Sequence, residues 1–168
     1  MYNYTLFTVI LLTKLLALYD VGDTISEEHQ NKIFNDICFG DYPSDIFKLK
    51  DFQNKVIWLH FSATWWDPCK GFIPVGEEVE EYWIDNENVA IIDFLDDIDN
   101  PYSCIQWGYI GNHSLPIIID DSDYDFHDQF HDIYPANVFI DHEMKVYAIL
   151  DTLYPFPSSI FQYAFNPA

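Results

Sequence analysis

The sequence contains no arginine, and its seven lysines leave a formal net charge of −21 at pH 7 over 168 residues. The stretch from Gly71 to Met144 has neither lysine nor arginine, although it holds most of the 28 acidic residues. A surface with this charge repels nucleic-acid phosphates and anionic lipid headgroups. We therefore expect no nucleic-acid partner, and we interpret the acidic side chains mainly as a solvated surface that favours solubility.

Cysteine is also scarce, because the chain has only Cys38, Cys69 and Cys104. In an oxidising compartment two of these can pair and leave one free thiol. Their spacing alone does not distinguish among the three pairings. The aromatic content of 18% is nevertheless too high for a disordered chain.

The chain has no apolar run long enough to span a bilayer comfortably. The apolar residues near the N-terminus end at Leu18 and are interrupted by Lys14. We expect residues 1–19 to be a signal peptide, with an uncleaved anchor or an ordinary buried helix as the alternatives. The protein is then exported, periplasmic or extracellular, without membrane contact beyond such an anchor. Residues 20–168 are expected to form a single domain.

Strand-like and helix-like patterns alternate along the chain. Residues 56–61 and 89–95 are apolar at nearly every position, as in central strands covered on both faces. Residues 70–82 have the period of a helix that Pro74 should kink. Shorter elements are expected as strands at 46–49 and 115–119, helices at 101–109, 124–133 and 158–165, and a hairpin over 136–150. The expected fold is therefore an α/β sandwich of three layers, with a mixed central sheet flanked by helices and a closing β-hairpin.

The segment from Ala63 to Lys70, which links the first buried run to the next helix, reads ATWWDPCK. It resembles the strand-to-helix corner of thioredoxin-like proteins, whose pattern is Trp-Cys-x-x-Cys. Trp65 matches the tryptophan of that pattern, and Cys69 matches its second cysteine. Trp66 stands where the first cysteine is expected.

Four segments resemble the redoxin branch of this superfamily, which includes peroxiredoxins and periplasmic thiol-disulfide proteins. They are the approach to the corner (49–65), the helix start with its proline (68–74), an additional strand (115–120) and the strand after the family's cis-proline (134–141). The resemblance extends over roughly residues 45–151.

The resemblance implies a thioredoxin-like fold, thiol-disulfide chemistry without a cofactor, and a groove that pairs with an extended substrate. It identifies Pro135, preceded by Tyr134, as the cis-proline beside the redox motif. If Cys69 is the resolving type of cysteine, Cys38 and Cys104 are the expected structural disulfide.

Dithiol exchange needs one thiolate to attack and a second thiol to release the mixed disulfide. The indole of Trp66 cannot attack, so two main hypotheses stay open, beside the lesser alternative of a purely structural envelope protein without a groove function. The first is a divergent oxidoreductase that acts through Cys69, with Cys38 or Cys104 as partner. The second is a redox-inactive module that holds an extended peptide or a partner protein. Its binding residues would be Trp65, Trp66, Asp67, Pro68, Tyr134 and Pro135.

The same corner also has a purely structural interpretation. Asp67 is a favourable N-cap and Pro68 a favourable first helical residue. Cys69 would then lie in the first turn, either as a thiolate stabilised by backbone N–H groups or as a buried inert thiol. We expect the tryptophans to be mainly core residues, with an exposed Trp66 as the exception at a contact surface.

Two patterns near residue 125 are typical of cation sites. His127 and His131 have the i, i+4 spacing of a metal pair, although two histidines on a solvated helix face are more common. Three aspartates before them follow the spacing of a calcium loop, namely Asp121, Asp123 and Asp125. Phe126 stands where such a loop needs glycine, and Asp132 where it needs glutamate. We therefore expect no metal site, and looser cation binding at residues 120–128 stays open.

Overall fold

The computed structural model describes residues 18–40, 42–83, 85–110, 118–121, 126–130 and 133–151. Within these ranges the helical elements are α1 (Glu27–Gln30), η1 (Leu49–Phe52), α2 (Asp67–Trp83), α3 (Cys104–Gly108) and η2 (His127–Gln129). The strands are β1 (Ile37–Phe39), β2 (Val56–Ala63), β3 (Val89–Asp96), β4 (Ile118–Asp120), β5 (Ala136–Ile140) and β6 (Val146–Leu150).

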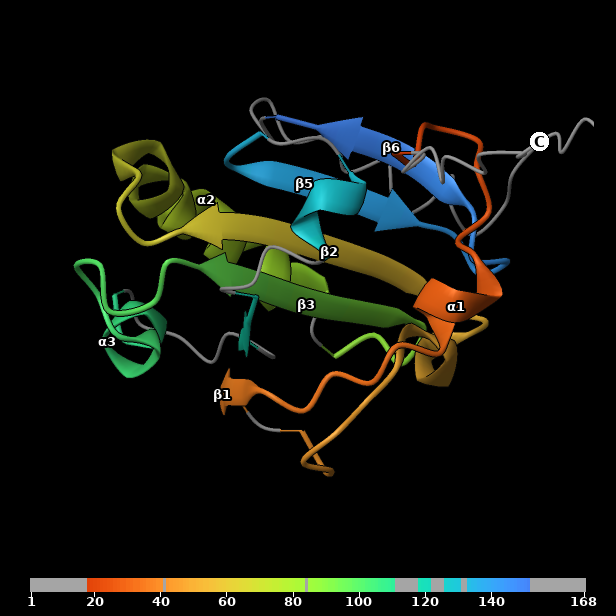
Figure 1. Ribbon diagram of the computed structural model, residues 1–168, viewed down its shortest axis with the longest axis horizontal. Coiled ribbons are helices and arrows are strands. Elements are labelled where there is room, and N and C mark those ends of the chain that lie inside the picture. The colour runs from red at the N-terminus through yellow and green to blue at the C-terminus, as the bar shows by residue number, and fades with distance from the viewer. Residues whose placement is uncertain are drawn as a thin grey trace, which may run out of the picture.

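The strands form one mixed sheet in the order β1-β4-β3-β2-β5-β6 (Figure 1). Strands β2, β3 and β4 run parallel, whereas β1, β5 and β6 pair antiparallel with their neighbours. The predicted α/β class, the mixed sheet and the closing hairpin are therefore confirmed.

Strand β2 lies at the centre of the sheet, and all its residues are buried. It pairs with β3 on one side and β5 on the other. Alternate residues point to opposite faces, so Trp58 lies in the cluster under α2 and Phe61 in the cluster on the other face. A strand buried on both faces explains the nearly continuous apolar run in the sequence.

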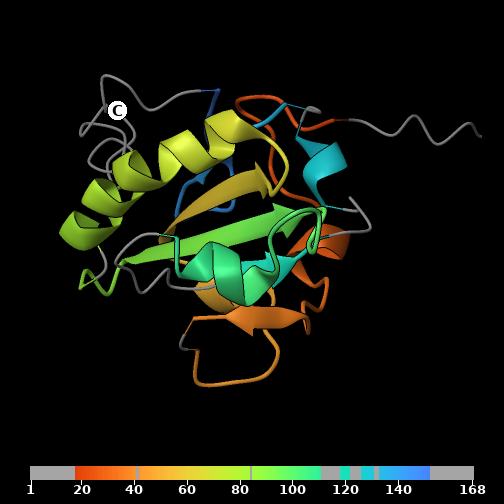
Figure 2. The same cartoon turned by 90° about the vertical axis from the view of Figure 1, so that its left-hand side faces the viewer.

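Helix α2 lies along one face of the sheet (Figure 2). Phe72, Val79 and Trp83 on this helix belong to one buried cluster with Trp58 and Phe139 of the sheet. Phe139 stacks on Trp58 at a ring-centroid distance of 5.9 Å. The apolar side of the predicted helix is therefore the side that covers β2 and β5.

The opposite face carries a core rich in phenylalanine. Its fully or nearly fully buried rings are those of Phe34, Phe47, Phe61, Phe94, Phe126 and Phe130. Phe94 of β3 contacts the rings of Phe61 at 5.1 Å and Phe126 at 5.3 Å. Each such pair adds about 0.5–1.5 kcal/mol beyond its buried area, so this cluster holds η2 against the sheet.

Two predicted elements are wrong. Residues 46–49 form no strand, because Phe47 makes a single bridge to Phe34 and the chain then enters the 3-10 helix η1. The Asp51 carboxylate accepts a hydrogen bond from the backbone N–H of Lys48 at 2.8 Å, which favours this turn.

The described part of 124–133 contains the 3-10 helix η2 instead of an α-helix. The backbone N–H of His127 donates to the carboxylate of Asp121 at 3.0 Å, a side-chain bond that competes with helical pairing. The predictions for residues 1–17, 115–117 and 158–165 lie outside the described residues.

Strand β1 and helix α3 are joined by a disulfide between Cys38 and Cys104. This is the pairing that the resemblance implies. Close to the disulfide, Gly108 lies against the side chain of Phe39. A Cβ atom on Gly108 would stand 2.5 Å from Cγ of that ring, which is too close for two carbon atoms that are not bonded to each other.

We expect Gly108→Ala to lower the free energy of unfolding by about 1–3 kcal/mol, because the new methyl group overpacks the contact with Phe39. Gly71→Ala is the matched control, since a Cβ on Gly71 in α2 meets no atom within 4 Å. It should raise stability by up to about 1 kcal/mol through helix propensity. Urea denaturation measures both, and equal stability of the two variants would contradict this packing.

Candidate functional site

Trp65 and Trp66 lie at the junction between the end of β2 and the start of α2. Their side chains are 48% and 41% exposed, and their ring centroids are 5.5 Å apart at an angle of 58°. Trp66 is exposed as predicted, but Trp65 is not a core residue. Its indole N–H donates to Oδ2 of Asp97 at 2.6 Å, and this bond is made at the surface. Trp58, Trp83 and Trp107 are buried.

The indole N–H of Trp66 donates to the backbone carbonyl of Tyr134 at 3.1 Å. Tyr134 precedes Pro135, and the peptide bond between them is cis. The structure therefore places Trp66 next to the proline segment, 68 residues further along the chain.

Helix α2 begins at Asp67, so Trp66 and not Asp67 holds the cap position. The carbonyl of Trp66 accepts from the backbone N–H of Cys69 at 2.9 Å and from that of Lys70 at 3.4 Å. The predicted cap is therefore displaced by one residue. Asp67 instead places its carboxylate in the first turn, where the helix dipole favours a negative charge.

No protein-family model matches the sequence, and no curated protein matches it. Solved structures do match. A putative thiol:disulfide interchange protein DsbE from Chlorobium tepidum has a TM-score of 0.67 at 16% identity, over 89% of this chain and all of that one. The chain has a thioredoxin-like fold.

Two further solved structures share this fold. A secreted disulfide oxidoreductase of Mycobacterium tuberculosis, homologous to E. coli DsbE, has a TM-score of 0.58 at 16% identity, over 76% of this chain and 87% of that one. PrxQ from Xylella fastidiosa has a TM-score of 0.58 at 14% identity, over 86% of this chain and 92% of that one. At these identities the likeness establishes the fold alone.

Cys69 is the only free cysteine of this thioredoxin-like chain, and it is completely buried. Burial raises the pKa of its thiol to about 11, and the charges of Asp93 and Asp96 act in the same direction. Hydrogen bonds with the Ala63 backbone and the Ser62 side chain lower this pKa only in part. At neutral pH Cys69 is therefore a thiol and not the thiolate that disulfide exchange requires.

A row of buried polar groups continues from Cys69 along the face under α2. The Ser62 hydroxyl lies 3.3 Å from Nε2 of His60, and Nδ1 of His60 lies 2.9 Å from a carboxylate oxygen of Asp93. His60 and Asp93 are direct partners in the β2–β3 register. Sequence reasoning missed this pair, although a histidine and an aspartate inside two otherwise apolar runs were the available signal.

A second buried network holds Tyr134 from the other face of the sheet. The Tyr134 hydroxyl donates to the carboxylate of Asp96, and the His127 ring stacks on the Tyr134 ring at 4.2 Å. Burial raises the pKa of Asp96 to about 8, with the bond from Tyr134 opposing the shift and the charge of Asp121 adding to it. His127 is completely buried, so the predicted solvated helix face is wrong for this residue, and His131 lies outside the described residues.

The loop after β3 is hydrogen-bonded to the thioredoxin-like corner. The Thr64 hydroxyl lies 2.5 Å from the carbonyl oxygen of Asp97 and 2.8 Å from that of Asn100. The side chain of Thr64 is buried, whereas Asp99 in the loop is exposed. These bonds fix the acidic loop beside Trp65.

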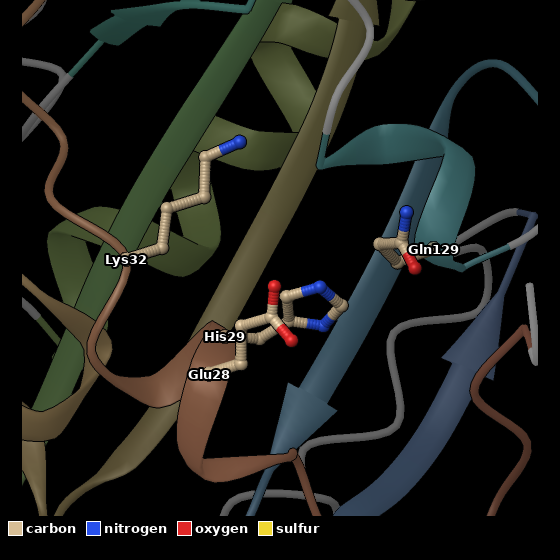
Figure 3. Close-up of a pocket in the computed structure, with 4 residues that line it drawn as sticks. All are labelled: Glu28, His29, Lys32 and Gln129. Carbon is tan, nitrogen blue, oxygen red and sulfur yellow. The ribbon is translucent and has the colours of Figure 1, made fainter. Parts of the chain in front are cut away.

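A separate surface pocket of about 360 Å³ lies between α1 and η2 (Figure 3). Glu28 and His29 come from α1, Lys32 follows that helix, and Gln129 comes from η2. The lining mixes both charges with an imidazole and an amide, and none of the four residues belongs to the corner.

The described ranges contain no group of three or more His, Cys, Asp or Glu side chains placed to hold a metal ion. Asp123 and Asp125 of the calcium-like pattern lie outside those ranges. Nor does any helix in the described part have the length and apolar character needed to cross a membrane.

Glu80 of α2 is buried under the helix, 7% exposed. Burial raises the pKa of its carboxyl from 4.5 to about 8, and the charges of Asp93 and Glu77 add to the shift. The folded protein therefore keeps a proton on Glu80 that the unfolded chain releases at neutral pH.

The free energy of unfolding should fall as the pH rises from about 4.5 to about 8. Glu80 then contributes a slope of at most about 1.4 kcal/mol per pH unit, because the unfolded chain binds fewer protons in this range. Glu80→Gln removes the titrating group, so its stability should fall less over the same range. Asp96 shifts in the same direction and leaves a residual slope. Urea unfolding at several pH values measures this, and identical slopes in both proteins would contradict the assignment to Glu80.

Proposed function

We propose that this protein is a thioredoxin-fold binding module that holds an extended segment of a protein partner beside Trp66 and Pro135. The observation that carries the proposal is the pair of exposed indoles at the corner where a nucleophilic cysteine is expected. Tryptophan is strongly enriched among the residues that dominate protein interfaces.

The corner is already organised for binding. The bond from Trp66 to the Tyr134 carbonyl fixes the indole, so less side-chain freedom is lost when a partner docks. Ile133, next to Tyr134, adds an apolar side chain that is 48% exposed. The exposed apolar side chains therefore lie on both segments that form the corner.

The state of the three cysteines favours a binding function over dithiol exchange. Cys38 and Cys104 are joined to each other, which leaves Cys69 without a second free thiol. Its burial and its pKa of about 11 further disfavour attack on a disulfide. Binding of an extended segment requires none of these sulfurs.

We propose further that the protein is exported, with residues 1–19 as signal peptide or anchor and 20–168 as one domain. The Cys38–Cys104 disulfide is typical of an oxidising compartment. The likeness to a secreted disulfide oxidoreductase supports the same location.

Unstructured, cysteine-free peptides of neutral composition should quench or shift the tryptophan fluorescence on binding. Trp66→Ala should weaken this binding about tenfold or more, because it removes the central apolar contact. Tyr82→Ala is the control, since Tyr82 is a 76% exposed aromatic residue near the far end of α2. Absence of peptide binding at millimolar concentration, or equal binding by both variants, would overturn the proposal.

The second candidate function is thiol-disulfide exchange through Cys69, favoured by the likeness to thiol:disulfide interchange proteins. It requires Cys69 to become exposed by local opening and to ionise.

We expect a thiol reagent to label Cys69 at neutral pH about 100-fold more slowly in the native protein than in urea, because the thiol is buried and its pKa is high. The absorbance of the group that the reagent releases, followed over time, gives the labelling rates of the native and the unfolded protein. Rapid native labelling, together with reduction of a small disulfide that disappears in Cys69→Ser, would favour the second candidate instead.

A further inference from the structure

The charges around the corner indicate which kind of segment fits it. We propose, on the basis of the proposed function, that the bound segment is basic. One of its lysine or arginine side chains lies against Trp65 and Trp66. The carboxylates of Asp97 and Asp67 lie beside that side chain. This assigns a partner chemistry to the surface and makes Asp97 and Asp67 its specificity-determining residues.

The aromatic half of this site is the indole pair. The two rings are inclined at 58° with centroids 5.5 Å apart, and both are nearly half exposed. Tryptophan is the aromatic side chain that attracts a cation most strongly over its face, and arginine is the cation most often found there. An extended segment that covers Trp66 therefore gains most when it carries a guanidinium or an ammonium at this point.

The anionic half is held in place by the fold. Oδ2 of Asp97 accepts the indole N–H of Trp65 at 2.6 Å, so the carboxylate lies at the edge of that ring. The Thr64 hydroxyl fastens the backbone of the same loop. Asp67 is exposed in the first turn of α2, directly after Trp66, and Asp99 is exposed in the loop. A cation between indoles and carboxylates gains from both.

The chain places one positive charge of its own near this surface, within reach of the charge of Asp67. Lys70 is the sole lysine or arginine in residues 56–144 of the sequence. Its ammonium donates to the Tyr102 hydroxyl at 2.7 Å and lies 4.7 Å from the centroid of the Tyr102 ring. With a net charge of −21, the protein also attracts a basic partner at long range.

The test uses three cysteine-free peptides with one shared neutral core and arginine, glutamine or glutamate at the flanking positions. Binding to the full chain is followed by tryptophan fluorescence at low ionic strength and at about 0.5 M salt, where charges are screened. The arginine peptide should bind about tenfold more tightly than the glutamine peptide, and the glutamate peptide most weakly. High salt should reduce these differences.

Charge-neutralising variants assign the preference to the corner. Asp97→Asn and Asp67→Asn should each lower the affinity for the arginine peptide severalfold and leave the glutamine peptide nearly unchanged. Glu87→Gln removes the same charge from an exposed residue at the opposite end of β3 and should change neither affinity. If Glu87→Gln weakens binding of the arginine peptide as much as the two aspartate variants do, net charge explains the preference. The assignment of the preference to Asp97 and Asp67 is then wrong.

The outcomes separate the two proposals. If no peptide binds, the proposed function fails and the basic partner fails with it. If all three peptides bind equally, and Trp66→Ala weakens each of them, the binding module stands and the basic partner is wrong. A preference for the glutamate peptide would also overturn the basic partner.

Discussion

The parallel pairing of β2 with β3, buried on both faces, is the constraint on which the rest of this structure depends. The two central apolar runs of the sequence form these strands, and their pairing brings the carboxyl ends of β2 and β3 together. Trp65 and Trp66 follow the end of β2, while Asp97 follows the end of β3. Because parallel strands end at the same edge, these residues become neighbours and Trp65 can bond to Asp97. The corner and its acidic loop are consequences of this pairing, and the antiparallel pairing of β2 with β5 brings the proline segment beside them.

In the proposed binding function, an indole stands at this edge where a sulfur nucleophile is expected. A thiolate at a helix N-terminus can attack a disulfide. An exposed tryptophan instead offers apolar contact area, a fixed orientation and a ring face that attracts cations. The remaining motif cysteine, Cys69, is a buried residue in the first turn of α2, where it interacts with the Ser62 side chain and the charge of Asp93. There its burial opposes ionisation. The two indoles are therefore at the surface of the corner, and the free thiol is enclosed below it.

Local patterns predicted the long elements well and the short ones poorly. The runs at 56–61 and 89–95 are strands, and 70–82 lies within a helix, because burial on both faces or on one side imposes a clear period. At 46–49 and 124–133 a single side-chain bond overrides the pattern: Asp51 to the Lys48 backbone, and Asp121 to the His127 backbone. Such bonds depend on geometry that a pattern of apolar residues does not contain.

The sequence by itself determined the fold class and the position of the corner, since the order of apolar runs and the residues from Trp65 to Cys69 are local properties. It also determined the acidity and the absence of a first motif cysteine. Only the tertiary structure decided that Trp65 stays at the surface, that His60 pairs with Asp93 and that His127 is buried against Tyr134. These outcomes depend on partners more than 30 positions away in the first two cases, and on burial created by the whole sheet in the third. Chain proximity does not encode them, because packing brings their groups together only after the strands have paired.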